Sequence, residues 1–351
     1  MAVPTPQMSR TLADTAIDFA PGVALSAAVA GAAYLAAPYA AHALPIPAMV
    51  LALVIGIALN PIASRPSVQP GMAFCVRTLL RWAVALLGLR VALSDIAALG
   101  LATGVLVVLA MIVTLRAGFF FARLSGRQPG FGALVGSATA VCGASAALAT
   151  STVVPDYPGK QADVVFVVVA VNALATLAMV VFPPLCILFG FDAQTTGVML
   201  GGTIHDVAQV VGAGYAVSEP VGNTAVIVKL FRVFLLLPVV LGIGWYFTTR
   251  GVKHGQARVP VPVFAIVFLA LCLLNSALPL APSVAPVAGP VKAVLIELSS
   301  WGLLIAIGAL GLGTSVATVV ALGWRHVATV LATTVVIFAL VTGGLLLGKI
   351  I

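Results

Sequence analysis

ADVVFVVVAVNALATLAMVVFPPLCILF, residues 162–189, contains a single charged residue, Asp163. A helix needs about 20 mostly apolar residues to cross the hydrocarbon core of a bilayer. The run meets that length, and it lacks the alternation of apolar and polar residues that a membrane barrel strand would show. The stretch therefore predicts a membrane-spanning helix.

The rest of the chain repeats this composition. Of its 351 residues, 62% are hydrophobic and 7% are charged, whereas a soluble domain carries about 25% charged residues. Lipid must be the solvent for most of the chain, so we predict an all-α integral membrane protein that forms one polytopic domain over residues 1–351. About ten or eleven transmembrane helices are expected, near 22–43, 47–64, 75–95, 97–122, 131–154, 162–189, 193–217, 221–248, 260–278, 290–313 and 326–349.

The net charge of +8 does not indicate a nucleic-acid partner, because Lys and Arg gather at the ends of the predicted helices. If eleven helices cross, eleven of these residues lie on one side and four on the other, where we place Arg90, Lys160, Lys292 and Lys349. The positive-inside rule then predicts a cytoplasmic N-terminus and a multi-pass protein of the cell inner membrane. The lipid bilayer is the expected partner.

Two stretches at membrane depth, Gly136–Ser145 and Gly201–Gly214, are rich in small and hydroxyl residues. Glycine costs about 1 kcal/mol relative to alanine inside a helix. One interpretation is a helix that is interrupted at mid-membrane, so that freed N–H groups face an anion. The other is close helix packing, for which small residues are typical in lipid. The first interpretation makes Gly143, Ser145 and Thr203 candidate substrate-binding residues.

The second stretch also contains His205 and Asp206. A charge at the centre of a membrane helix costs at least about 2.5 kcal/mol, so such groups usually face a cavity or a partner. His205 can titrate near neutral pH and Asp206 can bind a proton or cation, which makes them candidates for coupling-ion binding. The alternative is a structural polar pair. A His–Asp pair offers too few ligands for a metal, and we expect no metal and no cofactor.

Lys229 and Arg232 follow at i,i+3 spacing, which places both on one face of a helix. Few carboxylates lie away from predicted loops, namely Asp95, Asp206 and Glu297. Fixed cations without enough fixed anions predict that the substrate supplies the missing charge, so we assign Lys229 and Arg232 to substrate binding. Snorkelling from a helix end is the alternative.

Five motifs resemble, in chain order, those of the YeiH family of multi-pass bacterial membrane proteins, whose members are labelled sulfate exporters. The resemblance covers roughly residues 47–349. The motifs are LLGLRVALSD (86–95), AVCGAS (140–145), GTIHD (202–206), VIVKLFR (226–232) and LGLGTS (310–315).

The family is similar to sodium/proton antiporters and bile-acid-type symporters. That likeness implies inverted repeats with discontinuous crossing helices, here in halves 22–190 and 191–349. The resemblance implies functional roles for the residues at the matching motif positions, namely Thr203, His205, Asp206, Lys229 and Arg232. One feature departs from the pattern: counting crossings places both interrupted stretches in the same direction, whereas an inverted pair runs in opposite directions.

The expected function is a proton-coupled secondary transporter for a small inorganic anion such as sulfate or sulfite. One alternative is a sodium- or proton-coupled cation antiporter in which Asp206 binds the cation. Another is a membrane scaffold or sensor that transports nothing. The sequence contains no nucleophile–base set and no nucleotide-binding loop, so we expect no enzymatic activity. The sequence does not determine the oligomeric state, and a homo-oligomer is compatible with it.

Overall fold

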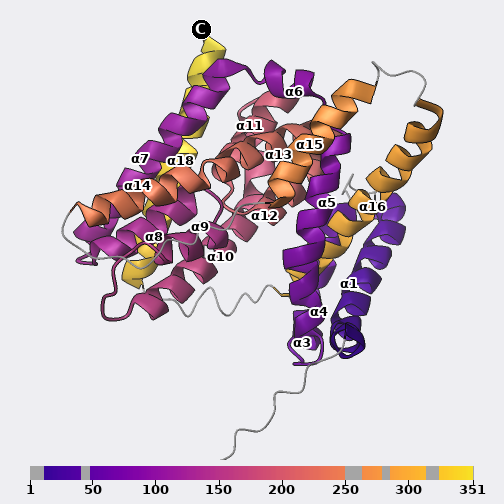
Figure 1. Ribbon diagram of the computed structural model, residues 1–351, viewed down its shortest axis with the longest axis horizontal. Helices are drawn as coiled ribbons and strands as arrows, with labels where there is room; N and C mark the ends of the chain where they lie inside the picture. Colours follow the sequence, from indigo (N-terminus) through magenta and orange to yellow (C-terminus); the bar gives the residue numbers. More distant parts are fainter. Residues whose placement is uncertain (1–11, 41–47, 250–262, 279–284, 314–323, 351) are drawn as a thin grey trace, which may run out of the picture. The chain divides into compact units, whose positions relative to one another are not determined.

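The computed structural model describes residues 12–40, 48–249, 263–278, 285–313 and 324–350 (Figure 1). Every regular element in these ranges is a helix, which confirms the all-α class. Seven helical segments are long and apolar enough to cross a membrane, as a multi-pass protein requires. They are Asp18–Tyr39, Gln69–Leu89, Gly100–Leu124, Lys160–Leu188, Glu219–Thr248, Ala288–Leu312 and His326–Gly348.

The helices follow one another with short connections. The first group is α1 (Leu12–Ala40), α2 (Ala48–Ala58), α3 (Asn60–Ala63), α4 (Gln69–Phe74), η1 (Cys75–Leu79), α5 (Leu80–Leu86), η2 (Leu87–Leu89), α6 (Leu93–Ala98) and α7 (Gly100–Leu124). The second is α8 (Pro129–Ala140), α9 (Ala144–Ser151), α10 (Lys160–Leu188), α11 (Ala193–Thr203), α12 (Val207–Val217), α13 (Glu219–Phe234) and α14 (Leu236–Thr248). The last is α15 (Val263–Ala277), α16 (Ala285–Leu312) and α18 (Trp324–Ile350).

The chain divides into two compact units, and their boundaries differ from those of the predicted halves 22–190 and 191–349. Unit 1 comprises Met1–Arg81 with Trp301–Thr314, and unit 2 comprises Trp82–Ser300 with Ser315–Ile351. The repeats proposed for the halves stay a prediction.

Close backbone contact between α2 and α16 holds unit 1 together. A Cβ atom on Gly56 would lie 2.6 Å from the carbonyl oxygen of Gly308, so only glycine fits there. Asn60 Nδ2 donates a hydrogen bond to the carbonyl oxygen of Leu312 at 2.7 Å. The residues that carry the predicted chemistry all lie in unit 2.

The first interrupted stretch, α8 and α9, folds back on itself. Thr150 Oγ1 donates to Ser137 Oγ at 2.8 Å although 13 positions separate these residues. The same number of residues in one continuous helix would span about 20 Å. Gly130, near the start of α8, lies against the ring of Tyr157, which follows α9. The two helices are therefore the arms of a hairpin, which we call the first hairpin, and the chain enters and leaves it at one side.

The second interrupted stretch, α11 and α12, is also a hairpin. Gly201 in α11 and Gly214 in α12 both lie against Ala225 of α13. They are thirteen positions apart, which again is about 20 Å in one continuous helix. We call this pair of helices the second hairpin. In Figure 1, α13 lies among the helices of this hairpin, near the centre of unit 2.

The two hairpins open toward opposite ends of α10. This helix has 29 residues and is about 44 Å long. The first hairpin precedes its start, and the second follows its end. Gln209 Nε2 of the second hairpin donates to Asn172 Oδ1, near the middle of α10, at 3.0 Å. The predicted helices 131–154 and 193–217 therefore do not cross the membrane as single elements. α8 and α11 run in opposite directions. Counting each stretch as one crossing helix made the two appear to run in the same direction.

The mouth of the first hairpin corrects the predicted side of Lys160. Arg127, just before α8, donates through Nη2 to Asp163 Oδ1 in the first turn of α10 at 2.6 Å. Lys160 begins α10, so it lies on the same side as Arg127 and not on the opposite one. Tyr157 donates to Asp163 Oδ2 at 3.1 Å. Burial and the Asp163 carboxylate raise the pKa of Tyr157, so its hydroxyl stays a donor at neutral pH.

Candidate functional site

The breaks of the two hairpins meet at α13. We call Val141–Gly143 the first tip and Ile204–Asp206 the second tip. Lys229 Nζ donates to the carbonyl oxygen of Val141 at 2.7 Å, to that of Ile204 at 3.1 Å and to that of His205. An ammonium group has three donors, so all three are used and both tips are joined through one side chain.

Arg232, one turn further along α13, makes four more hydrogen bonds to the ends of the same arms. Its Nε donates to the carbonyl of Ala140 at 3.0 Å and its Nη2 to that of Thr139 at 2.9 Å. Its Nη1 donates to the carbonyls of Gly201 at 2.9 Å and Ile204 at 3.2 Å. The guanidinium therefore binds the C-terminal ends of α8 and α11 together.

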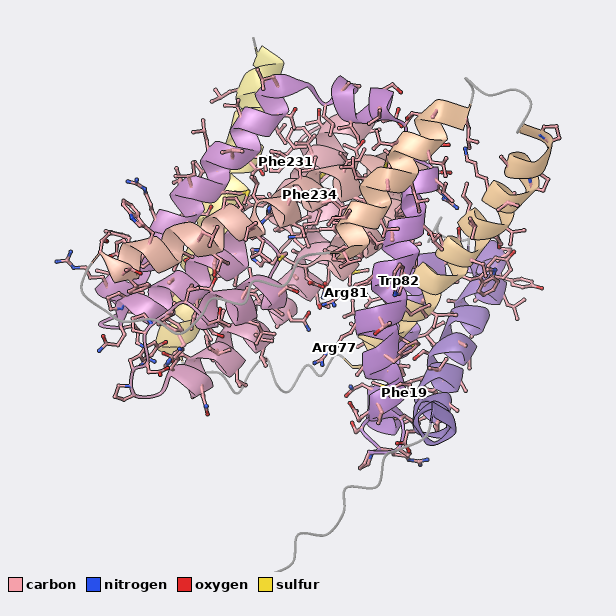
Figure 2. All side chains as sticks on the ribbon, viewed as in Figure 1. Phe19, Arg77, Arg81, Trp82, Phe231 and Phe234 are labelled. Atoms are coloured by element: carbon pink, nitrogen blue, oxygen red, sulfur yellow. The ribbon has the colours of Figure 1, made fainter. Side chains whose placement is uncertain are left out.

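These contacts follow from the electrostatics of helix ends. The last four carbonyls of a helix lack intrahelical donors, and each C-terminus carries about half a negative charge. Lys229 and Arg232 are fully buried, at 0% exposure, and they offset the two C-termini that meet beside them. Phe231 and Phe234 of the same helix are each 38% exposed (Figure 2). The cations thus lie on the interior face of α13 and do not snorkel from a helix end.

The opposite arms place their N-terminal ends at the same tips. α9 follows Gly143, whose φ of +63° favours glycine and which has no side chain to cap this end. The start of α12 is capped by Asp206, whose carboxylate accepts from the backbone N–H of Ala208 at 3.3 Å. Ser145 and Asp206 are partly exposed, whereas the C-terminal ends of α8 and α11 are buried. The positive helix ends are therefore the accessible ones.

His205 is the middle residue of the second tip, and its ring contacts α18. Its Nε2 is 2.9 Å from Thr334 Oγ1, and its Nδ1 is buried and has no hydrogen bond among the described residues. Thr139 Oγ1 and Gln209 Oε1 are also buried without a hydrogen-bond partner in the described part of the chain. Buried polar atoms are normally paired. Unpaired atoms next to an interrupted helix are consistent with a site that receives a polar ligand.

The structure brings most of the predicted site residues together and separates one of them. Gly143 lies next to the second tip, since a Cβ atom on it would be 3.5 Å from the carbonyl oxygen of His205. Lys229 and Arg232 join both tips through backbone carbonyls, and whether they also bind substrate stays a prediction. Thr203 instead uses its hydroxyl within α11, where Oγ1 donates to the carbonyl of Met199 at 2.6 Å.

Two further residues of this site were not predicted individually, although Thr139 lies within the stretch Gly136–Ser145. Thr139 precedes the first tip, and Thr334 is one of several threonines in α18. No spacing or motif relates either of them to His205, so only the fold places them near it. Among the described residues, no group of three or more His, Cys, Asp or Glu side chains is arranged to hold a metal ion.

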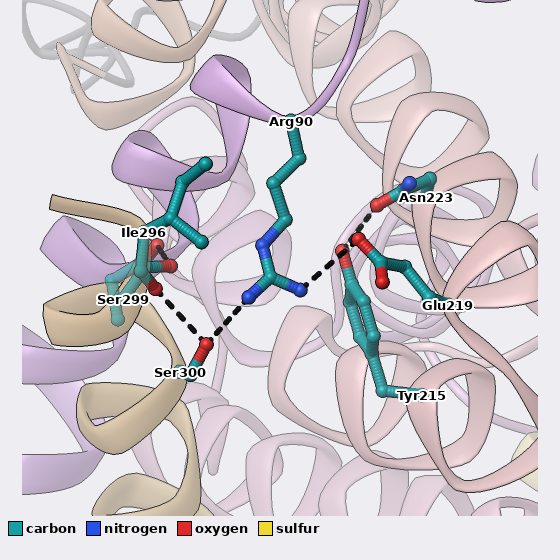
Figure 3. A network of polar contacts seen from close by, with 8 residues as sticks. Arg90, Tyr215, Glu219, Asn223, Ile296, Ser299 and Ser300 are labelled. Carbon is teal, nitrogen blue, oxygen red and sulfur yellow. Dashed lines mark hydrogen bonds and ion pairs between the residues drawn. The ribbon is translucent and has the colours of Figure 1, made fainter. Parts of the chain in front are cut away.

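The mouth of the second hairpin resembles that of the first in its chemistry. Arg90 donates through Nη1 to Glu219 Oε1 at 3.3 Å and through Nη2 to Ser300 Oγ at 2.6 Å (Figure 3). Beside this pair, Tyr215 donates to Asn223 Oδ1 at 2.6 Å. Each hairpin therefore has an arginine–carboxylate pair and a tyrosine where its arms meet the neighbouring helices.

Comparison with known proteins identifies relatives of the whole chain. Residues 21–330 match the family model described as conserved hypothetical protein 698. The UPF0324 membrane protein TauZ of Paracoccus pantotrophus is 45% identical over 93% of this chain and 94% of the relative. The UPF0324 inner membrane protein YeiH of Escherichia coli is 33% identical over 93% of this chain and 92% of the relative.

Proposed function

We propose that this chain, which belongs to the UPF0324 family of multi-pass membrane proteins, is a secondary transporter that moves a small anion across the cell inner membrane. The observation that carries the proposal is the pair of hairpin tips joined by two buried cations. Facing interrupted helices at mid-membrane are the usual substrate site of secondary transporters.

The contacts of Lys229 and Arg232 favour an anion over a cation. In transporters with interrupted helices, the free carbonyls and C-terminal helix ends coordinate sodium, and the N-terminal ends face anionic groups. Here those carbonyls accept hydrogen bonds from Lys229 and Arg232. The two side chains occupy the position of a coupling sodium ion, so the N-terminal ends are left for the substrate.

The charge balance at the tips supports the same conclusion. Two helix C-termini and two N-termini contribute about −1 and +1, which cancel. Lys229 and Arg232 contribute two positive charges and Asp206 one negative charge. The remaining excess is about +1, which favours a bound anion over a bound cation. Three carbonyl acceptors surround Lys229 Nζ, an arrangement that fits the charged ammonium with its three donors.

The anion would bind at the start of α9. This helix has eight residues, its N-cap residue Gly143 has no side chain to cap it, and Ser145 in its first turn is partly exposed. Backbone N–H groups and a hydroxyl are suitable donors for the oxygens of a sulfate- or sulfite-like anion. His205 and Asp206, on the facing tip, are the groups that would carry a coupled proton.

The proposal is tested by anion-driven currents in proteoliposomes on a solid-supported membrane, with sulfate, sulfite and chloride in sodium-free buffer. We expect Ser145→Ala to lower the current severalfold. Ser151→Ala, at the far end of the same helix, is the matched control and should leave the current unchanged. Currents that require sodium and no particular anion would favour a cation antiporter. No current with any ion would favour a scaffold or sensor.

A further inference from the structure

The contacts of His205 define which of its ring nitrogens carries a hydrogen. Thr334 Oγ1 donates its only proton to the carbonyl oxygen of Val330 at 2.9 Å, one turn back in α18. The same oxygen, 2.9 Å from Nε2 of His205, must then accept a hydrogen from the ring. Nε2 therefore carries the N–H, and Nδ1 has a free lone pair in the neutral ring.

That lone pair is buried and unused. Nδ1 has no hydrogen-bond partner among the described residues, and the His205 side chain belongs to a residue that is 1% exposed. Leaving such an acceptor unpaired is destabilising. A buried nitrogen that is kept without a partner beside a transport site can accept a proton.

The surroundings of the ring decide when it can be charged. Lys229 and Arg232 on α13 act on it as positive charges. Asp206 follows it in the chain, and the thiol of Cys142 lies near Lys229 in the first tip. α18 contributes the neutral Thr334. The neutral Asn172 and Thr176 of α10 contact Gln209, one turn after His205 in the chain. Two cations against one carboxylate oppose a third positive charge, unless an anion is bound at the tips.

We propose that the coupled proton binds to Nδ1 of His205 only when the anion is bound, and that Thr334 is the positioning residue that keeps Nδ1 free. The proposal rests on the transport function above and assigns the proton to His205 rather than to Asp206. The imidazole takes one proton from the aqueous phase that supplies the anion. It returns this proton as the anion leaves, so one proton and one anion move together.

The tautomer is tested without transport by ¹⁵N NMR of purified protein labelled at histidine, where His205→Gln identifies the signal. We expect the neutral ring with hydrogen on Nε2 at pH 7 in anion-free buffer. Addition of sulfite should shift the signal toward the imidazolium form. A hydrogen on Nδ1, or a charged ring in the anion-free protein, would overturn the proposal.

The positioning role is tested by the pH profile of anion flux. Flux of the wild-type protein should rise up to tenfold for each unit of acidification, as one coupled proton requires. Thr334→Ser should retain this profile, and Thr334→Val should displace its midpoint by about one pH unit, since one buried hydrogen bond contributes about 1 kcal/mol. Thr333→Val is the control, because the Thr333 hydroxyl donates to Thr329 and does not contact the ring.

The outcomes separate the two proposals. Anion flux that does not depend on pH in the wild-type protein would overturn the role of His205 and leave the transporter intact. Equal pH profiles for Thr334→Val and the wild type would overturn the role of Thr334. The absence of flux with every anion would overturn the transporter itself, and the NMR signal would still report the tautomer.

Discussion

Lys229 Nζ donates to the carbonyl oxygen of Val141 at 2.7 Å, although 88 positions separate the two residues in the chain. The contact joins α13 to the first tip, and two further hydrogen bonds from the same nitrogen join it to the second tip. The ammonium thus satisfies backbone groups that the interruption of two helices leaves without donors.

Replacing Lys229 by methionine should destabilise the protein. Lys229→Met removes the donor from three buried carbonyls, and each unpaired group costs about 1–3 kcal/mol, so we expect a loss of about 3 kcal/mol or more. Thermal unfolding in detergent measures the change. Lys160→Met, which breaks an ion pair with the exposed Asp156 and one hydrogen bond to the carbonyl of Val154, is the control and should cost less than Lys229→Met. Equal losses for the two variants would contradict the role given to Lys229.

Gly143 should not tolerate a side chain, because its φ is +63° and its ψ is −125°. A residue with a Cβ atom in such a conformation is strained by about 1–3 kcal/mol. We expect Gly143→Ala to lower the melting temperature and anion flux together. Gly242→Ala is the control, since no atom lies within 4 Å of its added Cβ. Wild-type flux and stability for Gly143→Ala would show that the first tip adopts another backbone conformation.

The hairpin topology can be tested by cysteine labelling from the two sides of the membrane. Gln128 and Asp156 flank the first hairpin, so Gln128→Cys and Asp156→Cys should react with a membrane-impermeant maleimide from the same side. Gln194→Cys, at the start of the second hairpin, should react from the other side. The four native cysteines are buried, so their background reaction should be low. Labelling of Gln128→Cys and Asp156→Cys from opposite sides would contradict the hairpin and show that the segment between them crosses the membrane once.

Asp206→Asn should tighten anion binding. The change removes the one carboxylate at the tips and raises the excess positive charge from about +1 to about +2. Asparagine caps helices as well as aspartate does, so stability should change by less than about 1 kcal/mol. We expect the KM for the transported anion to fall severalfold, without any requirement for sodium. A KM that rises, or a new dependence on sodium, would point to Asp206 as a cation ligand.

Tyr157→Phe should loosen the mouth of the first hairpin. The substitution deletes the 3.1 Å hydrogen bond to Asp163, and a hydrogen bond to a charged group contributes about 1.5–3 kcal/mol. Hydrogen exchange of the α8 and α9 amides, followed by mass spectrometry, should become faster while that of α11 and α12 does not. Unchanged exchange in the first hairpin would mean that Arg127 and His326, the other partners of Asp163, hold it in place without Tyr157.

Local composition was enough to predict the membrane environment, the helical class and the places where two helices are interrupted. These features depend on neighbours in the chain: apolar runs exclude water, and glycines at 136–143 and 201–214 weaken a helix wherever it packs. The two buried cations were also visible, because charged residues stand out in an apolar run. Their spacing predicted a common helix face, and both are indeed on the interior face of α13.

The tertiary structure decided what the sequence left open, which is the direction of the chain after each break. Arms of 12 and 8 residues are about 18 and 12 Å long, too short to cross a bilayer singly, yet end to end they have the length of a spanning helix. Hydropathy is the same for a crossing helix and for a hairpin, so only packing against α10 and α13 selects the fold-back. The partners of Lys229 and Arg232 are backbone carbonyls, which every residue possesses, and so no residue type in the sequence could reveal them.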